Sequence, residues 1–413
     1  MKLFFVAQFV PYPPVEGSSI YVFHRVDRVR AHHEVTFFAP LRRPTDGDSL
    51  TFLRDRGWTI ETLSKPPGIG VINILASRAR AFFSPIPVHW ALSWDRAIGS
   101  EMERQVRAHQ PEVVVIEHLI MTRFLPYIRR ATDAPIVFAD HNVEALWGAQ
   151  ASRELGLTFS GLLARSQAGK VRRQEVAMLN RCDLAIAISE ADRRELQRMA
   201  PSARIRVVPI GVDMDYFTPQ PEVEEDDVLV WVGGLNIGTN LAGLRFLANE
   251  ILPLIHRKRP EVRVEIVGRA PLPGILALAG PKVSVITDVP DVRPYMAKAT
   301  VFVVPIKPQS GVRLKMLEGF AMARATVSTS LAAEGLDVVD GEHLLIRDDA
   351  QSFADATVEL LSDKAKRDRL GAAGRALAKE NYSWEAACAE FETHLAEMMN
   401  SVNRPQEADL GHG

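Results

Sequence analysis

The strongest constraint on the fold is an alternation of short apolar runs with amphipathic stretches. The strand-like runs of the first half are Leu3–Ala7, Val35–Phe38, Thr59–Leu63, Val113–Ile116, Ile136–Ala139, Leu184–Ile188 and Arg206–Val208. Helical patterns separate them at Ile20–Ala31, Trp94–His109 and Ala164–Asn180. Because the runs are apolar on both faces, they are typical of a parallel sheet covered by helices.

The alternation stops once and then restarts. Pro209–Asp213, Pro219–Pro221 and the acidic run Glu222–Asp227 lack periodicity, which is typical of a linker or a domain entrance. The strand-like runs that follow are Val228–Val232, Val262–Val267, Val283–Ile286, Val301–Pro305 and Thr326–Thr329. A chain of 413 residues also exceeds what one core usually supports. We therefore expect an α/β protein of two doubly wound units whose sheets face one another across a cleft.

The end of the chain forms one further helical pattern, Ser383–Asn400, with an apolar stripe. The polar stretch 401–413 is expected to be disordered. The predicted domains are thus residues 1–208 together with the tail helix 384–400, then residues 209–383.

The composition argues against several classes of function and location. Lys and Arg total 49 against 51 for Asp and Glu, which argues against a dedicated nucleic-acid binder. Two cysteines, Cys182 and Cys388, cannot form a disulfide framework and suggest a reducing compartment, the cytoplasm. No apolar stretch approaches the ~20 residues that span a bilayer.

An aromatic and basic region in the first half suggests a peripheral contact with the inner face of a membrane. It comprises Arg78, Arg80, Phe82, Phe83, Trp90, Trp94 and Arg96. Such a surface would suit anionic lipids. The interpretation that we favour is that the aromatic residues pack in the core, because apolar residues usually point inward.

The segment Gln309–Ala323 carries the clearest sign of chemistry. It follows a buried strand and leads into a helix, so unpaired N–H groups at Gly311 could receive a phosphate. Arg313 and Lys315 add positive charge, and Glu318 could accept bonds from sugar hydroxyls. The alternative is that Lys315 and Glu318 form a surface pair on the helix.

Two other loops occupy the same strand-to-helix position. Gly17 and Ser18 follow the first strand, and Gly233 and Gly234 follow the first strand of the second half. Glycine lets a ligand approach the backbone closely. An ordinary turn with a Ser cap, or Thr239 acting only as a helix N-cap, is the alternative.

Polar residues also follow other strands. Asp140, His141 and Asn142 come directly after Ile136–Ala139, where substrate contacts collect in open sheets. Glu334 follows another strand and could likewise contact a sugar-containing ligand, although an ordinary turn with a solvated carboxylate would also explain a Glu at this position. The sequence from Ser189 is typical of a helix cap. No Cys/His cluster with metal-ligand spacing is present, so we expect no metal site.

These features together resemble glycosyltransferase family 4. The resemblance rests on the two Rossmann-like halves, the entrance VPIGVDMDYF and the helix SGVRLKMLEGFAMA, and on a glycine-loop segment similar to members that build bacterial polysaccharides. It covers most of the chain and implies a retaining GT-B enzyme that transfers sugar from a nucleotide-sugar. It also implies that the last helix crosses back to the N-terminal domain.

The resemblance assigns roles to the helix entry. Glu318 matches the second acid of the family's two-glutamate motif, which binds the donor ribose. Gly311, Val312 and Arg313 occupy the place where backbone amides meet the diphosphate, and Lys315 would steady the leaving diphosphate.

The resemblance extends to other positions. Gly17 and Ser18 match a loop near the donor phosphate and the acceptor, and His141 matches a histidine that contacts the transferred sugar. Arg313, Lys315 and His141 are therefore the expected catalytic residues. The expected donor-binding residues are Gly233, Gly234, Asn240, Ser310, Gly311, Val312, Glu318 and Glu334.

Two positions depart from the family pattern. Ser310 stands where most members have the first Glu, eight residues before Glu318. Leu235 and Asn236 replace the basic pair that usually follows the second glycine loop. Members with an RLK helix often lack that first Glu too.

The expected activity is therefore metal-independent, retaining hexosyl transfer from a nucleotide-diphosphate sugar, which acts as co-substrate, with no cofactor. The acceptor would be a glycan, a lipid-linked sugar or a small molecule bearing a hydroxyl. Two alternatives are a nucleotide-sugar epimerase of the same architecture and a non-catalytic partner of a transferase, which Ser310 favours.

Overall fold

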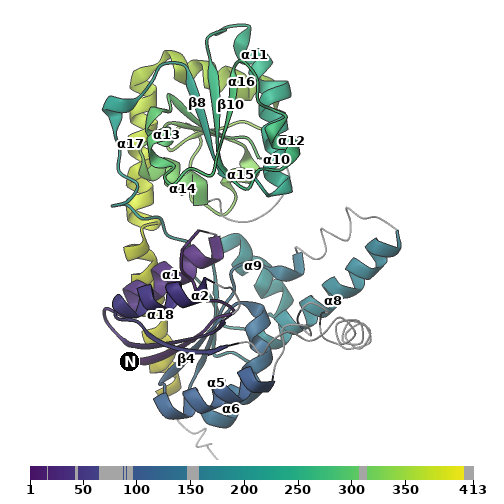
Figure 1. Cartoon of the computed structure of the whole chain (residues 1–413), viewed down its shortest axis with the longest axis vertical. Coiled ribbons are helices and arrows are strands. Elements are labelled where there is room, and N and C mark those ends of the chain that lie inside the picture. The colour runs from purple at the N-terminus through teal and green to yellow at the C-terminus, as the bar shows by residue number, and fades with distance from the viewer. Residues whose placement is uncertain are drawn as a thin grey trace, which may run out of the picture. The chain divides into compact units, whose positions relative to one another are not determined.

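The computed structural model describes residues 1–15, 17–41, 45–64, 87, 90, 96–146, 158–306 and 314–403. It divides into two compact units (Figure 1). Unit 1 comprises Met1–Val208 and Cys388–Gly413, and unit 2 comprises Pro209–Ala387.

Unit 1 is built on a parallel sheet of seven strands in the order β3-β2-β1-β4-β5-β6-β7. The strands are β1 Lys2–Val6, β2 Glu34–Leu41, β3 Thr59–Ser64, β4 Val113–Glu117, β5 Ile136–Ala139, β6 Leu184–Ala187 and β7 Ile205–Val207. The register is set by the apolar runs: Phe5 of β1 lies opposite Phe37 of β2 and Val115 of β4.

Helices separate the strands of unit 1. They are α1 Gly17–Val29, α2 Asp46–Asp55, α5 Arg96–His109, the 3-10 helix η1 Leu119–Phe124, α6 Leu125–Ala131, α8 Phe159–Leu179 and α9 Glu190–Met199. Ser189 caps α9 by accepting a bond from the N–H of Asp192 at 3.1 Å, so the capping prediction is confirmed.

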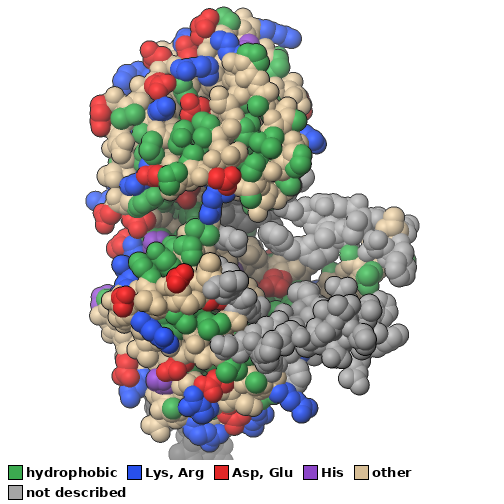
Figure 2. All heavy atoms as spheres, in the orientation of Figure 1, with side chains coloured by type: hydrophobic (Ala, Val, Ile, Leu, Met, Phe, Trp, Pro, Cys, Tyr) green, Lys and Arg blue, Asp and Glu red, His purple; other side chains and the backbone are tan. Residues whose placement is uncertain are grey.

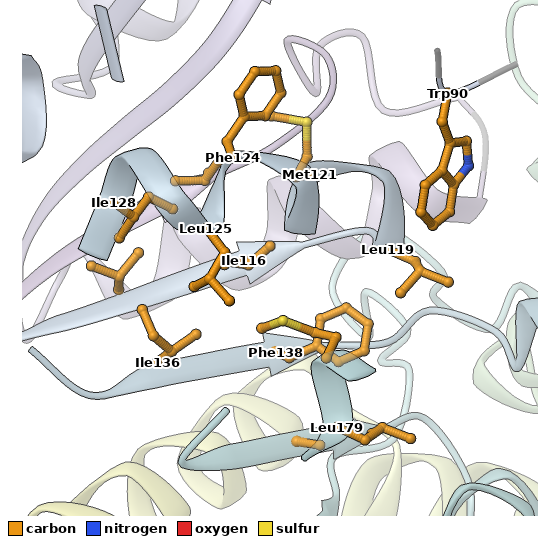
Figure 3. Close-up of a cluster of buried hydrophobic side chains, with 14 of the residues drawn as sticks. Trp90, Ile116, Leu119, Met121, Phe124, Leu125, Ile128, Ile136, Phe138 and Leu179 are labelled. Atoms are coloured by element: carbon orange, nitrogen blue, oxygen red, sulfur yellow. The ribbon is translucent and has the colours of Figure 1, made fainter. Parts of the chain in front are cut away.

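One core cluster of unit 1 joins β4 and β5 to the helices that follow them (Figure 3). Ile116 and Phe138 of the strands pack with Leu119 and Ile128, all of them buried. Trp90 is 1% exposed and belongs to this core, as the packing interpretation of the aromatic region predicts. Arg78, Arg80, Phe82, Phe83 and Trp94 of that region lie outside the described residues.

Unit 2 repeats the plan with six parallel strands in the order β10-β9-β8-β11-β12-β13. They are β8 Val228–Gly234, β9 Arg263–Arg269, β10 Val283–Thr287, β11 Val301–Val304, β12 Thr326–Ser328 and β13 Leu345–Ile346. The helical elements are η2 Pro221–Val223, α10 Gly238–Phe246, the π-helix η3 Leu247–Ile251, α11 Leu252–His256, α12 Pro273–Leu276, α13 Arg293–Lys298, α14 Leu314–Ala321, α15 Ser330–Ala333, α16 Ala350–Ser362 and α17 Lys364–Asn381.

The last helix, α18 Trp384–Asn403, packs along α1 and β1 of unit 1 (Figure 1). The Phe391 ring lies 6.4 Å from that of Phe5 and 5.1 Å from the Arg25 guanidinium. The expected return of the tail helix to the N-terminal domain is confirmed. Residues 401–403, expected to be disordered, are helical, and residues 404–413 lie outside the described part.

The acidic run before β8 is packed rather than free. Glu224 lies between Arg324, at 3.3 Å, and Arg367, at 2.9 Å, and Asp227 contacts Arg259 at 2.8 Å. This run lies near the start of unit 2, which begins at Pro209, as the interpretation as a domain entrance predicts. Glu224 and Asp227 pair there with guanidinium groups of unit 2.

Figure 2 shows Lys and Arg side chains interspersed with Asp and Glu over the visible face of each unit. Within the described residues, no helix combines the length and the apolarity that crossing a membrane would need.

Candidate functional site

Each sheet reverses its strand order once. The reversal lies between β1 and β4 in unit 1 and between β8 and β11 in unit 2. In open α/β sheets, ligands bind beyond the carboxyl ends of the strands at such a switch point. The residues that follow these four strands therefore define one candidate site in each unit.

In unit 2 the backbone at the end of β8 passes very close to its neighbours. A Cβ atom on Gly233 would lie 2.7 Å from Nζ of Lys315 and 2.9 Å from the Trp231 ring. A Cβ atom on Gly268 of β9 would lie 1.9 Å from the carbonyl oxygen of Gly233. Glycine is required at Gly268, because its Cβ would meet the backbone, whereas a Cβ at Gly233 would crowd the Trp231 ring and displace the ammonium of Lys315.

Lys315 lies on the first turn of α14 and faces this glycine loop. Its Nζ atom donates to Oδ1 of Asn240 at 3.2 Å and lies 3.9 Å from the centre of the Trp231 ring. Asn240 is buried and in turn donates to the carbonyl of Gly234 at 2.7 Å. The structure thus brings together four residues predicted from sequence: Gly233, Gly234, Asn240 and Lys315.

Glu318 lies one turn further along α14 and is half-buried. Burial raises the pKa of this carboxyl to about 7, although the charge of Lys315 acts in the opposite direction. At neutral pH the group is therefore divided between its protonated and ionised forms, and it can donate or accept a hydrogen bond.

The remaining predicted donor residues divide into two groups. Ser310, Gly311, Val312 and Arg313 lie outside the described residues. Glu334 is exposed and follows α15, on the strand-end side of β12. Thr239 is not the N-cap of α10, which begins at Gly238 after Ile237, so that alternative is wrong.

In unit 1, Gly17 and Ser18 form the first residues of α1. Oγ of Ser18 lies 2.5 Å from Nε2 of His118, which directly follows β4. His118 has a φ of 72° and a ψ of 135°, a conformation that only glycine adopts without strain. Strained residues of this kind cluster at functional sites.

His141 stacks on His118, with ring centres 4.4 Å apart and planes 28° apart. Nε2 of His141 lies 2.7 Å from Oε2 of Glu117, the last residue of β4. Nη2 of Arg25 donates to both oxygens of Glu117, at 2.7 and 2.6 Å. The two histidines therefore sit on a buried ion pair at the switch point.

A second buried carboxylate group lies behind His141. Asp140 is 3% exposed, and burial together with the nearby charge of Glu175 of α8 raises its pKa. Glu175 accepts the N–H groups of Glu144 and Ala145 at 2.8 and 3.2 Å. Burial raises the pKa of Glu175 to about 8 and that of Glu144 to about 7. Asp140 is thus a buried residue, and Glu175 holds the loop that follows it through these two backbone bonds.

Sequence reasoning missed three residues of the unit 1 site. Glu117 and His118 end an apolar run as Asp140 and His141 do, so the rule used for His141 would have found them. Arg25 lies among Tyr21, Val22 and Val26 on the apolar face of α1. A charged residue on the apolar face of a predicted helix usually has a buried partner, and this was the feature of the sequence that could have identified Arg25.

Both units match glycosyltransferase models. A model described as "Glycosyltransferase Family 4" matches residues 15–216, and one described as "Glycosyl transferases group 1" matches residues 226–363. The two doubly wound parallel sheets in one chain give the protein a GT-B architecture. The chain belongs to glycosyltransferase family 4.

Two curated relatives are similar in sequence. A GDP-mannose-dependent alpha-(1-6)-phosphatidylinositol monomannoside mannosyltransferase of Mycolicibacterium smegmatis is 24% identical over 339 residues, 75% of this chain and 82% of that protein. An uncharacterized 44.6 kDa protein in the cps region of Klebsiella pneumoniae is 28% identical over 135 residues. That match spans 30% of this chain and 35% of the Klebsiella protein.

Solved structures share the fold. Sucrose-phosphate synthase from Thermosynechococcus elongatus has a TM-score of 0.70 at 16% identity, covering 97% of this chain and 100% of that one. Anabaena Alr3699/HepE in complex with UDP and glucose has a TM-score of 0.64 at 15% identity, covering 96% of this chain and 99% of that one. The expected GT-B architecture is confirmed.

Proposed function

We propose that the protein is a retaining, metal-independent hexosyltransferase that uses a nucleotide-diphosphate sugar and a hydroxyl acceptor. The observation that carries this proposal is the close approach of Lys315 to the glycine loop Gly233-Gly234 at the switch point of unit 2. A cation beside bare backbone at this edge suits a pyrophosphate.

The chemistry follows from the charge that develops as the leaving diphosphate departs. Lys315, together with Arg313 and the backbone amides of residues 311 and 312, would stabilise that charge as it forms. Glu318 would bind ribose hydroxyls. In unit 1, His141 would contact the transferred sugar, and Gly17 and Ser18 would lie near the donor phosphate and the acceptor.

The names of the relatives support this choice of substrates. The mycobacterial relative is named as using GDP-mannose, and the Anabaena protein was solved with UDP and glucose. We propose a glycan, a lipid-linked sugar or a small hydroxyl compound as acceptor, and a cytoplasmic location with peripheral membrane contact.

The test is release of nucleoside diphosphate by the purified full chain. UDP-, GDP-, ADP- and TDP-sugars are supplied with cell-extract acceptors, with and without EDTA, and the anomeric configuration of the product is read by NMR. Acceptor-dependent release that survives EDTA, with retention, supports the proposal. Conversion of the donor sugar without an acceptor indicates an epimerase, and nucleotide binding without turnover indicates a non-catalytic protein.

A further inference from the structure

The side chains of Arg25, Glu117 and His141 form a deeply buried charged array, and a gain in folding stability does not by itself explain charges in such a place. The exposed fractions of these side chains are 1%, 0% and 8%. Replacing a buried ion pair by apolar residues is often neutral or stabilising. An ion pair that persists at a switch point therefore requires another explanation.

Burial of the Arg25 guanidinium costs free energy, because its hydrogen bonds are incomplete. Among the described residues its Nε and Nη1 atoms have no hydrogen-bond partner. Its guanidinium lies instead 4.3 Å from the ring centre of Tyr21 and 5.1 Å from that of Phe391. The carboxylate of Glu117 is thus its ionic partner, and the aromatic rings exclude water from the pair.

The charges of the array fix the protonation of His141. Burial alone would raise the pKa of Glu117, but the charge of Arg25 and bonds from His141 and Arg25 hold it below its ordinary value. Burial lowers the pKa of His141 and outweighs the pull of Glu117. The positive charge of Arg25 and the negative charge of Glu117 cancel, so the array has no net charge when the imidazole of His141 is neutral.

A neutral imidazole beside an ionised carboxylate has its proton on the nitrogen that faces the carboxylate. In His141 that nitrogen is Nε2, at 2.7 Å from Glu117. No hydrogen bond from the described residues reaches Nδ1, so this nitrogen can accept one from a ligand. The ring plane is fixed by stacking on His118 and by the edge contact with Tyr21, whose ring centre lies 4.8 Å away.

We propose that Glu117 and Arg25 are positioning residues, which hold His141 as the neutral Nε2–H tautomer and present Nδ1 as an acceptor for a substrate hydroxyl. This inference rests on the proposed sugar transfer, because it deepens the role of His141 there. Glu117 acts only through His141, and Arg25 only through Glu117.

The first test needs no substrate. Long-range proton–nitrogen NMR of the histidine rings in the full chain, with His141 assigned by His141→Gln, reports its tautomer and its titration. We expect the Nε2–H form at pH 7 and loss of a single tautomer in Glu117→Gln. An imidazolium or an Nδ1–H form at pH 7 in the unmodified protein would overturn the proposal.

The second test uses the transfer reaction. Glu117→Gln should lower kcat at least about tenfold in the wild-type background, but less than about twofold in His141→Ala, because the two residues act as one unit. Equal losses in both backgrounds would show a purely structural role.

Glu224→Gln is the matched control. It also removes a carboxylate from between guanidinium groups, Arg324 and Arg367, but in unit 2. It should leave the His141 spectrum unchanged. If Glu117→Gln does not fold, the spectrum of the unmodified protein still decides the proposal. If no donor is turned over, the proposed function fails while the spectrum still tests the tautomer.

Discussion

Replacing Lys315 by Met separates its charge from its packing. The Met side chain keeps an apolar stem against Trp231 but removes the cation 3.9 Å from that ring and the bond to Asn240. A cation–π contact contributes about 0.5–1 kcal/mol and a hydrogen bond about 0.5–1.5 kcal/mol. Unit 2 should therefore lose about 1–2.5 kcal/mol, a shift in Tm of about 2–10 °C.

The expected loss in the reaction is much larger. One preorganised group aimed at charge that develops in the transition state contributes about 10²–10³ in rate. The affinity for UDP or GDP should fall less, about 10-fold, because the bound diphosphate carries much of the same charge. The loss should therefore appear mainly in kcat.

The measurements are steady-state nucleoside diphosphate release, calorimetric titration with UDP and GDP, and thermal unfolding. Lys258→Met is the control, because Lys258 pairs with Asp355 at 2.7 Å on the surface of unit 2. It should leave kcat within twofold. If Lys315→Met keeps kcat within about fivefold while Tm falls as stated, Lys315 is a packing residue and the leaving-group role is refuted.

Three other perturbations test the fold and the site. Burial raises the pKa of Glu318 from 4.5 to about 7. The protonated group therefore contributes its full free energy of unfolding below about pH 4.5, and this contribution of about 1–3 kcal/mol is lost as the pH rises through 7. Urea unfolding of Glu318→Gln should not show this decrease with pH. Gly268→Ala should cost at least about 2 kcal/mol, because its Cβ would meet the Gly233 carbonyl, whereas Gly280→Ala, with open space, should cost under about 0.5 kcal/mol; similar unfolding midpoints would contradict the close approach. Glu175→Ala should lose about 2–4 kcal/mol at pH 7, because it leaves the buried N–H of Ala145 and the half-buried N–H of Glu144 without an acceptor. Glu175→Gln, which mimics the protonated acid, should stay within about 1 kcal/mol, and equal losses of the two variants in denaturant would rule out that acceptor role.

The two sheets could be predicted because each strand is an apolar run long enough to show its period. β5 was predicted with its observed bounds, Ile136–Ala139, and the other predicted strands differ from the observed ones by a few residues at their ends. β13, Leu345–Ile346, was missed because two residues cannot display a period. Its place beside β12 is set by pairing of Val327 with Leu345, which is a tertiary contact.

The sites were predictable only in part, for the same reason. Lys315 and Gly233 each stand at a recognisable strand-to-helix junction, Gly233 at the end of β8 and Lys315 at the start of α14, so the local pattern suffices to select them. Arg25 and Glu117 are 92 residues apart, and neither is unusual in its own segment.

The array Arg25–Glu117–His141 of unit 1 forms only in the folded sheet, where α1, which carries Arg25, lies beside the end of β4, which carries Glu117. Phe391 of α18 then covers the Arg25 guanidinium and completes the array. There Nε2 of His141 lies 2.7 Å from the buried carboxylate of Glu117. The chemistry of this site therefore depends on the topology, whereas in unit 2 the loop sequence already carries much of it.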